Sequence, residues 1–157
     1  WMSITDGKNN LNRYSQDGIE PLIFDIGELN DYQIGPDDQI FTNENQMQKR
    51  NISIISFAKN NPFEFTKDIV IENDNLGTWT VTDKSIYYLI MAGNKKSILY
   101  SSDLKGNNQV ELDTIRGDVN QSKGQLSISA DHNHLFITVV TKVVSDLYLM
   151  KDKTEIN

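Results

Sequence analysis

Apolar residues in this chain fall in runs of four to seven, separated by short stretches rich in Asn, Asp, Gly, Lys and Ser. Runs of this length suit β-strands, and no helical period of 3.6 residues connects them. They are rich in β-branched and aromatic residues, as at 86–92, 97–102, 110–115 and 135–140. The nine glycines, at 7, 18, 27, 35, 77, 93, 106, 117 and 124, lie between the runs, where turns require them. We therefore predict an all-β fold.

Two landmarks recur along the chain at nearly constant intervals. One is the hydrophobic element represented by Leu11, Ile54-Ile55, Leu99-Tyr100 and Leu147-Tyr148, with intervals of 43, 45 and 48 residues. The other is an apolar pair directly after a polar turn, at Ile40-Phe41, Ile86-Tyr87 and Leu135-Phe136, with intervals of 46 and 49 residues. Two landmarks with the same drifting step indicate an internal repeat rather than one local hairpin.

A period near 45 residues with about four short strands is typical of a β-propeller, in which each blade is a four-stranded antiparallel meander. We name the strands of a blade a to d, outward from the axis. The sequence predicts a partial blade at 1–27 without strand a, complete blades at 28–73 and 74–118, and a partial blade at 119–157 without strand d. We expect one propeller-type domain with an incomplete ring, cut from a longer chain.

Two stretches resemble a known group of repeats. "LSISADHNHLFITVV" followed by "SDLYLMK", and "WTVTDKSIYYLIMAGNKKSILYSSDLKG", are similar to the WD40-like repeats of TolB-type propellers. The shared phrase is a strand, a Ser-x-Asp-Gly-like turn, a Leu-aromatic strand and an Asp-Leu-Tyr strand. The chain departs from it at His132-Asn133, where the turn usually carries Gly, and it lacks the Trp-Asp pair of true WD40 blades. The resemblance covers most of the chain as architecture, and its motif specifies fold better than function.

The resemblance implies a non-catalytic binding or sensory module. Its most concrete forms are the extracytoplasmic sensor of a bacterial membrane-anchored winged-helix transcriptional regulator and a periplasmic protein-interaction module. The alternative is the gating propeller of a prolyl-oligopeptidase-like serine hydrolase. The chain has no Gly-x-Ser-x-Gly elbow, so we predict no catalysis by this segment, and a hydrolase domain would lie elsewhere. We expect a periplasmic or extracytoplasmic location, with the cytoplasm left open.

Composition narrows the range of partners. Lys and Arg number 15 against 22 Asp and Glu, and this net charge of -7 argues against direct contact with nucleic acid. No stretch approaches the roughly 20 apolar residues of a membrane-spanning helix, so we predict no membrane insertion by this segment. Cysteine is absent, which excludes disulfides and thiol chemistry. The expected partner is a protein or peptide, or the remaining blades of the same chain, or a second copy that closes the ring.

Neither a metal site nor a cofactor site is predicted. His132 and His134 are two residues apart, but only Asp131 lies near them in sequence. Asp37-Asp38, and Asp103 with Gly106, resemble pieces of a calcium loop without its full oxygen-ligand spacing. We interpret these aspartates as turn formers that bind their own backbone.

A binding site is expected at the mouth of the propeller channel, where the d–a and b–c loops meet. We place the d–a loops at 26–32, 73–79 and 117–125, and the b–c loops at 6–10, 42–51, 92–97 and 141–145. Aromatic and Arg side chains commonly anchor interfaces. The candidate binding residues are Tyr32, Lys49, Arg50, Trp79, Lys95, Lys96 and Arg116. The alternative is that Trp79 packs between blades and that the basic side chains are merely solvated.

Overall fold

The computed structural model describes the backbone of residues 2–5, 8–15, 18–23, 29–46, 49–58, 61–117, 126–129, 131, 133–141 and 144–151. Side chains are described over a narrower set, namely 31–37, 39–43, 50–58, 64–117, 126–129, 131 and 133–139. No helix in these parts of the chain is long and apolar enough to span a membrane.

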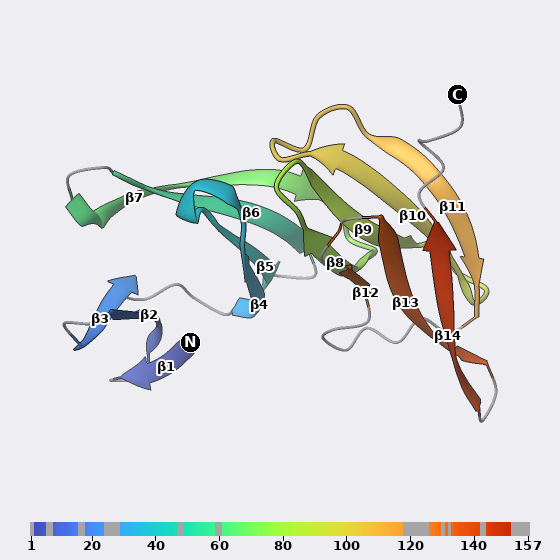
Figure 1. Cartoon of the computed structure of the whole chain (residues 1–157), viewed down its shortest axis with the longest axis horizontal. Helices are drawn as coiled ribbons and strands as arrows, with labels where there is room; N and C mark the ends of the chain where they lie inside the picture. The colour runs from blue at the N-terminus through green and yellow to red at the C-terminus, as the bar shows by residue number, and fades with distance from the viewer. Residues whose placement is uncertain are drawn as a thin grey trace.

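The described strands form four antiparallel sheets that follow one another along the chain (Figure 1). The first contains β1 (Met2–Thr5), β2 (Lys8–Ser15) and β3 (Gly18–Ile23). The second contains β4 (Leu29–Ile34), β5 (Ile40–Gln46), β6 (Lys49–Ala58) and β7 (Asn61–Glu72), with a short 3-10 turn η1 (Pro36–Asp38) after β4. The third contains β8 (Leu76–Val81), β9 (Ser85–Met91), β10 (Lys96–Asp103) and β11 (Val110–Arg116). The fourth contains β12 (Leu126–Ile128), β13 (His134–Thr141) and β14 (Val144–Lys151).

Each sheet is a meander, because every strand pairs with its neighbours in sequence. Two meanders have four strands and the two outer ones have three. This confirms the predicted all-β class, with two complete and two partial propeller blades. The runs predicted as strands at 86–92, 97–102, 110–115 and 135–140 correspond to β9, β10, β11 and β13.

The β8–β11 sheet is apolar on both faces, and β9 shows why. Successive side chains of a strand point to opposite faces. Ile86 and Tyr88 belong to one hydrophobic cluster, whereas Leu89 belongs to another. Tyr87 packs against the same cluster as Leu89. A nearly continuous apolar run such as "SIYYLIM" is therefore typical of a strand that is covered on both faces.

The two hydrophobic clusters lie between successive sheets. The first joins Phe41, Ile52 and Ile71 of the β4–β7 sheet to Leu76, Trp79, Ile86 and Tyr88. The second joins Leu89 and Leu99 of the β8–β11 sheet to Leu126, Leu135, Ile137 and Val139 of the β12–β14 sheet. Each fully buried side chain of this size contributes about 1.5–3 kcal/mol. The hydrophobic core thus lies between the blades.

A glutamine side chain bridges the innermost strands of the two complete blades. The side-chain amide of Gln33, on β4, donates a hydrogen bond to the carbonyl oxygen of Trp79 at 3.0 Å. Its amide oxygen accepts hydrogen bonds from the backbone N–H of Val81 at 2.9 Å and from the hydroxyl of Thr80 at 3.1 Å. Gln33 therefore binds two backbone groups and one hydroxyl of β8 and links the two blades.

Some predicted loop boundaries are wrong. The loop expected at 42–51 is mostly strand, because the β5–β6 ladder continues to the pair Gln46 and Lys49. The loops expected at 26–32 and 73–79 end earlier, since Tyr32 lies in β4 and Trp79 lies in β8. Gly77 also lies inside a strand, at a register shift of β8 against β9, where an added Cβ would approach the Leu89 carbonyl oxygen to 3.3 Å.

The turn between β10 and β11 touches the preceding blade through Gly106. The φ of Gly106 is +77°, and a Cβ added there would lie 1.8 Å from the carbonyl oxygen of Val70 on β7. Gly93 has nearly the same φ, +75°, but nothing lies within 4 Å of its added Cβ. A substitution at Gly93 therefore adds backbone strain alone, whereas a substitution at Gly106 also adds a steric clash between blades.

We expect Gly106→Ala to destabilise the protein more than Gly93→Ala. Both changes carry the left-handed backbone penalty of roughly 1–2 kcal/mol. Only Gly106→Ala also forces β7 and the turn apart, at an overpacking cost of roughly 1–3 kcal/mol. Urea unfolding of the two variants measures the difference. Equal losses of stability would show that the turn does not pack against Val70 in solution.

Candidate functional site

The turn between β9 and β10 lies beside the end of β11. The backbone N–H of Lys96 donates to the carbonyl oxygen of Gly93, and the N–H of Ala92 donates to that of Lys96, both at 2.9 Å. Asn94 and Lys95 adopt positive φ values of 48° and 55°. The N–H of Gly117, directly after β11, donates to the carbonyl oxygen of Lys95 at 2.7 Å. The b–c turn and the start of the d–a connection therefore meet at the two outer strands of this blade.

This end of the sheet carries a cluster of cations. Lys96 and Arg116 are directly opposite each other in the β10–β11 ladder, and both side chains are exposed. Lys95 is exposed on the adjoining turn. We call these three residues the basic ridge. Like charges directly opposite each other disfavour strand pairing, so this pair of cations lowers the stability of the β10–β11 ladder.

Arg50 joins the corresponding end of the preceding sheet to the next blade. Its guanidinium donates to the carbonyl oxygen of Leu76, the first residue of β8, at 2.9 Å. Its own carbonyl oxygen accepts from the N–H of Asn73 at 3.0 Å. The d–a turn at 73–75 is closed by a bond from the Leu76 N–H to the Asn73 carbonyl oxygen at 3.0 Å. Arg50 thus stabilises the contact between two blades.

The other candidate residues are dispersed. Trp79 is buried, with an exposure of 3%, in the cluster between the two complete blades, and its indole N–H has no partner among the described residues. Tyr32 is half-buried on β4. The side chain of Lys49 lies outside the described residues. The structure therefore groups Lys95, Lys96 and Arg116, and it places Trp79 as the packing alternative expects. A binding role for each of the seven stays a prediction.

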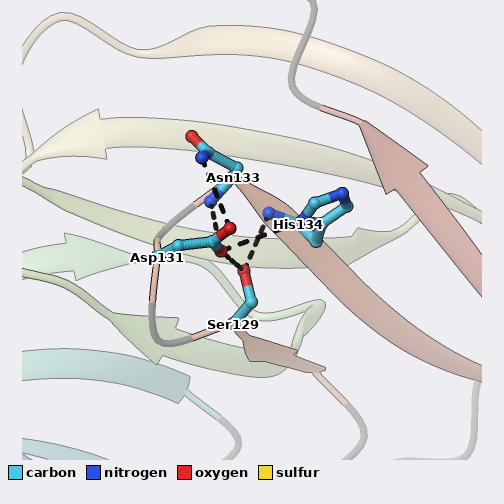
Figure 2. Close-up of polar contacts among 4 residues, drawn as sticks. All are labelled: Ser129, Asp131, Asn133 and His134. Atoms are coloured by element: carbon cyan, nitrogen blue, oxygen red, sulfur yellow. Dashed lines mark hydrogen bonds and ion pairs between the residues drawn. The ribbon is translucent and has the colours of Figure 1, made fainter.

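The turn that contains Asp131 is closed by its own side chains (Figure 2). The Asp131 carboxylate accepts hydrogen bonds from the Ser129 hydroxyl, from the Asn133 N–H at 3.2 Å and from the Asn133 amide at 3.4 Å. The Ser129 hydroxyl oxygen in turn accepts from the N–H of His134 at 3.0 Å. These bonds, that from Ser129 first, lower the pKa of Asp131 from 3.8 to about 2. The Ser-x-Asp element is therefore a cap for the turn between β12 and β13.

The preceding blade caps its shorter turn between β8 and β9 with a threonine hydroxyl. The Thr82 hydroxyl oxygen accepts from the N–H groups of Lys84 and Ser85, at 3.2 and 3.0 Å. Thr82 and Ser85 also pair through their backbones at 2.9 Å. Both turns thus use a hydroxyl oxygen to accept a backbone N–H, although they differ in length.

Some of the residues considered for metal binding have structural roles, and His132 lies outside the described residues. Asp103 binds its own turn through the N–H groups of Lys105 and Asn107, both at 2.9 Å, which confirms the turn interpretation there. The carboxylate of Asp131 lies 3.8 Å from the Nδ1 atom of His134. Among the described residues no group of three or more His, Cys, Asp or Glu side chains is arranged to hold a metal ion.

Sequence reasoning missed a hollow of about 170 Å³ between β7 and the β8–β11 sheet. It is lined by Ile71, Glu72, Asn73, Tyr88, Ile90, Tyr100 and Gln109. The rings of Tyr88 and Tyr100 stack within it, with their centroids 5.7 Å apart and their planes 17° from parallel. Burial, and to a smaller extent Tyr100, raises the pKa of Tyr88 to about 12. The pairing of β9 with β10 puts the two tyrosines opposite each other, and this register is the signal that would have located the hollow.

The pKa of Asp131 predicts how stability depends on pH. The folded protein binds the proton less tightly than the unfolded chain, whose carboxyl has a pKa near 3.8. The carboxylate therefore stabilises the fold above about pH 4, and this contribution disappears as pH falls toward 2. We expect Asp131→Asn to be less stable than the wild type at pH 7 and to approach it near pH 2, as measured by urea midpoints.

Glu64→Gln, which removes an exposed carboxylate on β7, is the control for the loss of one charge. A stability difference between the wild type and Asp131→Asn that does not change between pH 7 and pH 2 would contradict the assignment.

Comparison with known proteins identifies the fold. No protein-family model and no curated protein matches the chain. Among solved structures, it is similar to the crystal structure of TolB from Acinetobacter baumannii, with a TM-score of 0.68 and 13% sequence identity. The match covers 93% of this chain and 36% of the TolB chain. At this identity the likeness shows the fold alone, so the chain is a set of TolB-like β-propeller blades that spans about a third of that structure's length.

Proposed function

We propose that this chain is a non-catalytic binding module that contacts an acidic segment of a protein partner through the basic ridge of Lys95, Lys96 and Arg116. The observation that carries the proposal is the direct opposition of Lys96 and Arg116 at one end of the β8–β11 sheet. Both side chains are exposed, so burial does not explain why two cations share this position.

Electrostatics favours an acidic partner for this surface. The chain as a whole carries a net charge of -7, so a cluster of three cations stands out from its average surface. Complementary charge steers association and selects partners more than it adds affinity. The ridge also lies where the b–c turn meets the d–a connection, which is the end of a propeller that commonly binds partners.

Within this class we propose an extracytoplasmic role. The TolB-like fold supports either a periplasmic protein-interaction module or the sensor of a bacterial membrane-anchored winged-helix regulator. The gating propeller of a serine hydrolase is the alternative. The sequence of the natural polypeptide on both sides of the segment, read by peptide mapping, separates the three. A basic winged helix with a membrane span indicates the regulator, and a nucleophile elbow indicates the hydrolase.

We also propose that further blades, from the same chain or from a second copy, cover the three-stranded outer sheets. The β8–β11 sheet is covered on both faces, and a sheet of this kind is stable only when its apolar faces are covered. Light scattering on the isolated segment measures whether it associates. A well-folded monomer of the segment alone would count against this part of the proposal.

Charge reversal on the ridge tests the binding role. We expect Lys96→Glu with Arg116→Glu to weaken binding of a decaglutamate peptide by about tenfold at low salt, because two attractive contacts become repulsive. Fluorescence anisotropy of the labelled peptide measures the affinity. Lys84→Glu, an exposed residue of the turn between β8 and β9 at the other end of the sheet, is the matched control and should bind as the wild type does.

The single variant Lys96→Glu distinguishes a functional role from a structural one. It replaces a repulsive pair with an attractive one, so stability should rise by roughly 0.2–1 kcal/mol while peptide binding falls. Binding that is equal in wild type, ridge variants and the Lys84 control would overturn the proposal.

A further inference from the structure

We propose that the hollow between β7 and the β8–β11 sheet binds the side chain of an arginine presented by a partner peptide. This site is separate from the basic ridge and is carried by different observations. The hollow measures about 170 Å³, below the roughly 300–1,000 Å³ of small-molecule and cofactor sites. Its size therefore suits one long side chain.

The stacked tyrosines provide a surface for a planar cation. Tyr88 is buried, with an exposure of 2%, whereas Tyr100 is only half-buried. The stack with Tyr88 fixes the ring of Tyr100 in one orientation. Guanidinium groups bind the faces of aromatic rings in this way, by cation–π attraction and stacking. Ile71 and Ile90 line the same hollow and can pack against the aliphatic part of an arginine.

The charges around the hollow select a cation over an anion. Glu111 is directly opposite Tyr100 in the β10–β11 ladder, so both side chains lie on the same face of the sheet. Its side chain is exposed. Glu72 lines the hollow from the β7 side. The carboxylate of Glu111 thus lies beside the ring of Tyr100 and complements the guanidinium that its face attracts.

The hollow also offers a hydrogen-bond acceptor to an arginine side chain. Gln109 lines the hollow, and its amide nitrogen donates to the carbonyl oxygen of Gly106 at 3.3 Å. This bond orients the amide of Gln109 and makes its oxygen the acceptor that remains for a ligand. An arginine from outside is therefore the group that this combination of ring, carboxylates and amide fits.

The test uses the pentapeptide Gly-Gly-Arg-Gly-Gly and its citrulline counterpart, which has the same shape without the charge. We expect the arginine peptide to shift the NMR signals of Tyr100 and Gln109, and the citrulline peptide to bind at least fivefold more weakly. Tyr100→Phe keeps the ring face and should bind as the wild type does. Tyr100→Leu and Glu111→Gln should each lose at least threefold in affinity. The control is Glu64→Gln, which removes an exposed carboxylate on β7 that does not line the hollow, and it should keep the affinity of the wild type.

Two results would overturn this inference. One is equal binding of the arginine and citrulline peptides, and the other is retention of full affinity in Tyr100→Leu with a wild-type-like fold by circular dichroism. The ridge variant Lys96→Glu with Arg116→Glu should bind the arginine peptide no more weakly than the wild type. This control makes failure of the arginine site distinguishable from failure of the basic ridge.

Discussion

The structure depends on the burial of the β8–β11 sheet on both of its faces. In β9, Tyr88 and Leu89 are adjacent in sequence and both are buried, but they belong to different clusters on opposite faces of the sheet. Neither cluster can form within a single blade, since each takes side chains from two successive sheets. Stability is therefore a property of neighbouring pairs of blades, as in other repeat architectures. The turns and edges at which function is proposed are held in place by these shared cores.

Much of this architecture can be predicted from the sequence, because the continuous apolar runs that bury both faces also mark the strands. The apolar run at 86–92 is nearly β9, and the landmark pairs Ile40-Phe41 and Leu135-Phe136 lie at or near the start of β5 and β13. Loop lengths are harder to predict. Asn43 and Asn51 are polar but buried, and the Asn51 amide oxygen accepts a hydrogen bond from the Ser53 hydroxyl at 3.2 Å. A polar stretch whose groups find partners can continue a ladder, so its composition alone does not mark a loop.

The candidate site was predicted only in part, for a related reason. Turn positions along the chain are enough to bring Lys95, Lys96 and Arg116 to one end of a blade. They do not show that Trp79 points into the core, because an aromatic residue at the boundary of a strand can face a neighbouring blade or a ligand equally well. The tyrosine stack in the hollow depends on the pairing of Tyr88 with Tyr100, and pairing register is a property of the folded sheet.

A single irregularity of register links the two surfaces proposed to bind partners. The β10–β11 ladder shifts between Leu99 and Tyr100, so that Leu112 on β11 has no partner across the ladder. Without this bulge, the register that pairs Tyr100 with Glu111 would place Ile115, not Arg116, opposite Lys96.

The bulge also decides which charges share a face. Lys96 and Tyr100 lie on the same face of β10, because they are separated by an even number of residues. Their partners on β11, Arg116 and Glu111, are separated by an odd number, so an unbroken strand would present them on opposite faces. Leu112 is the inserted residue, and its side chain packs against the cluster shared with the β12–β14 sheet. Packing of this half-buried leucine on that face therefore helps to hold the register that gives both the pair of cations at the ridge and the carboxylate beside Tyr100.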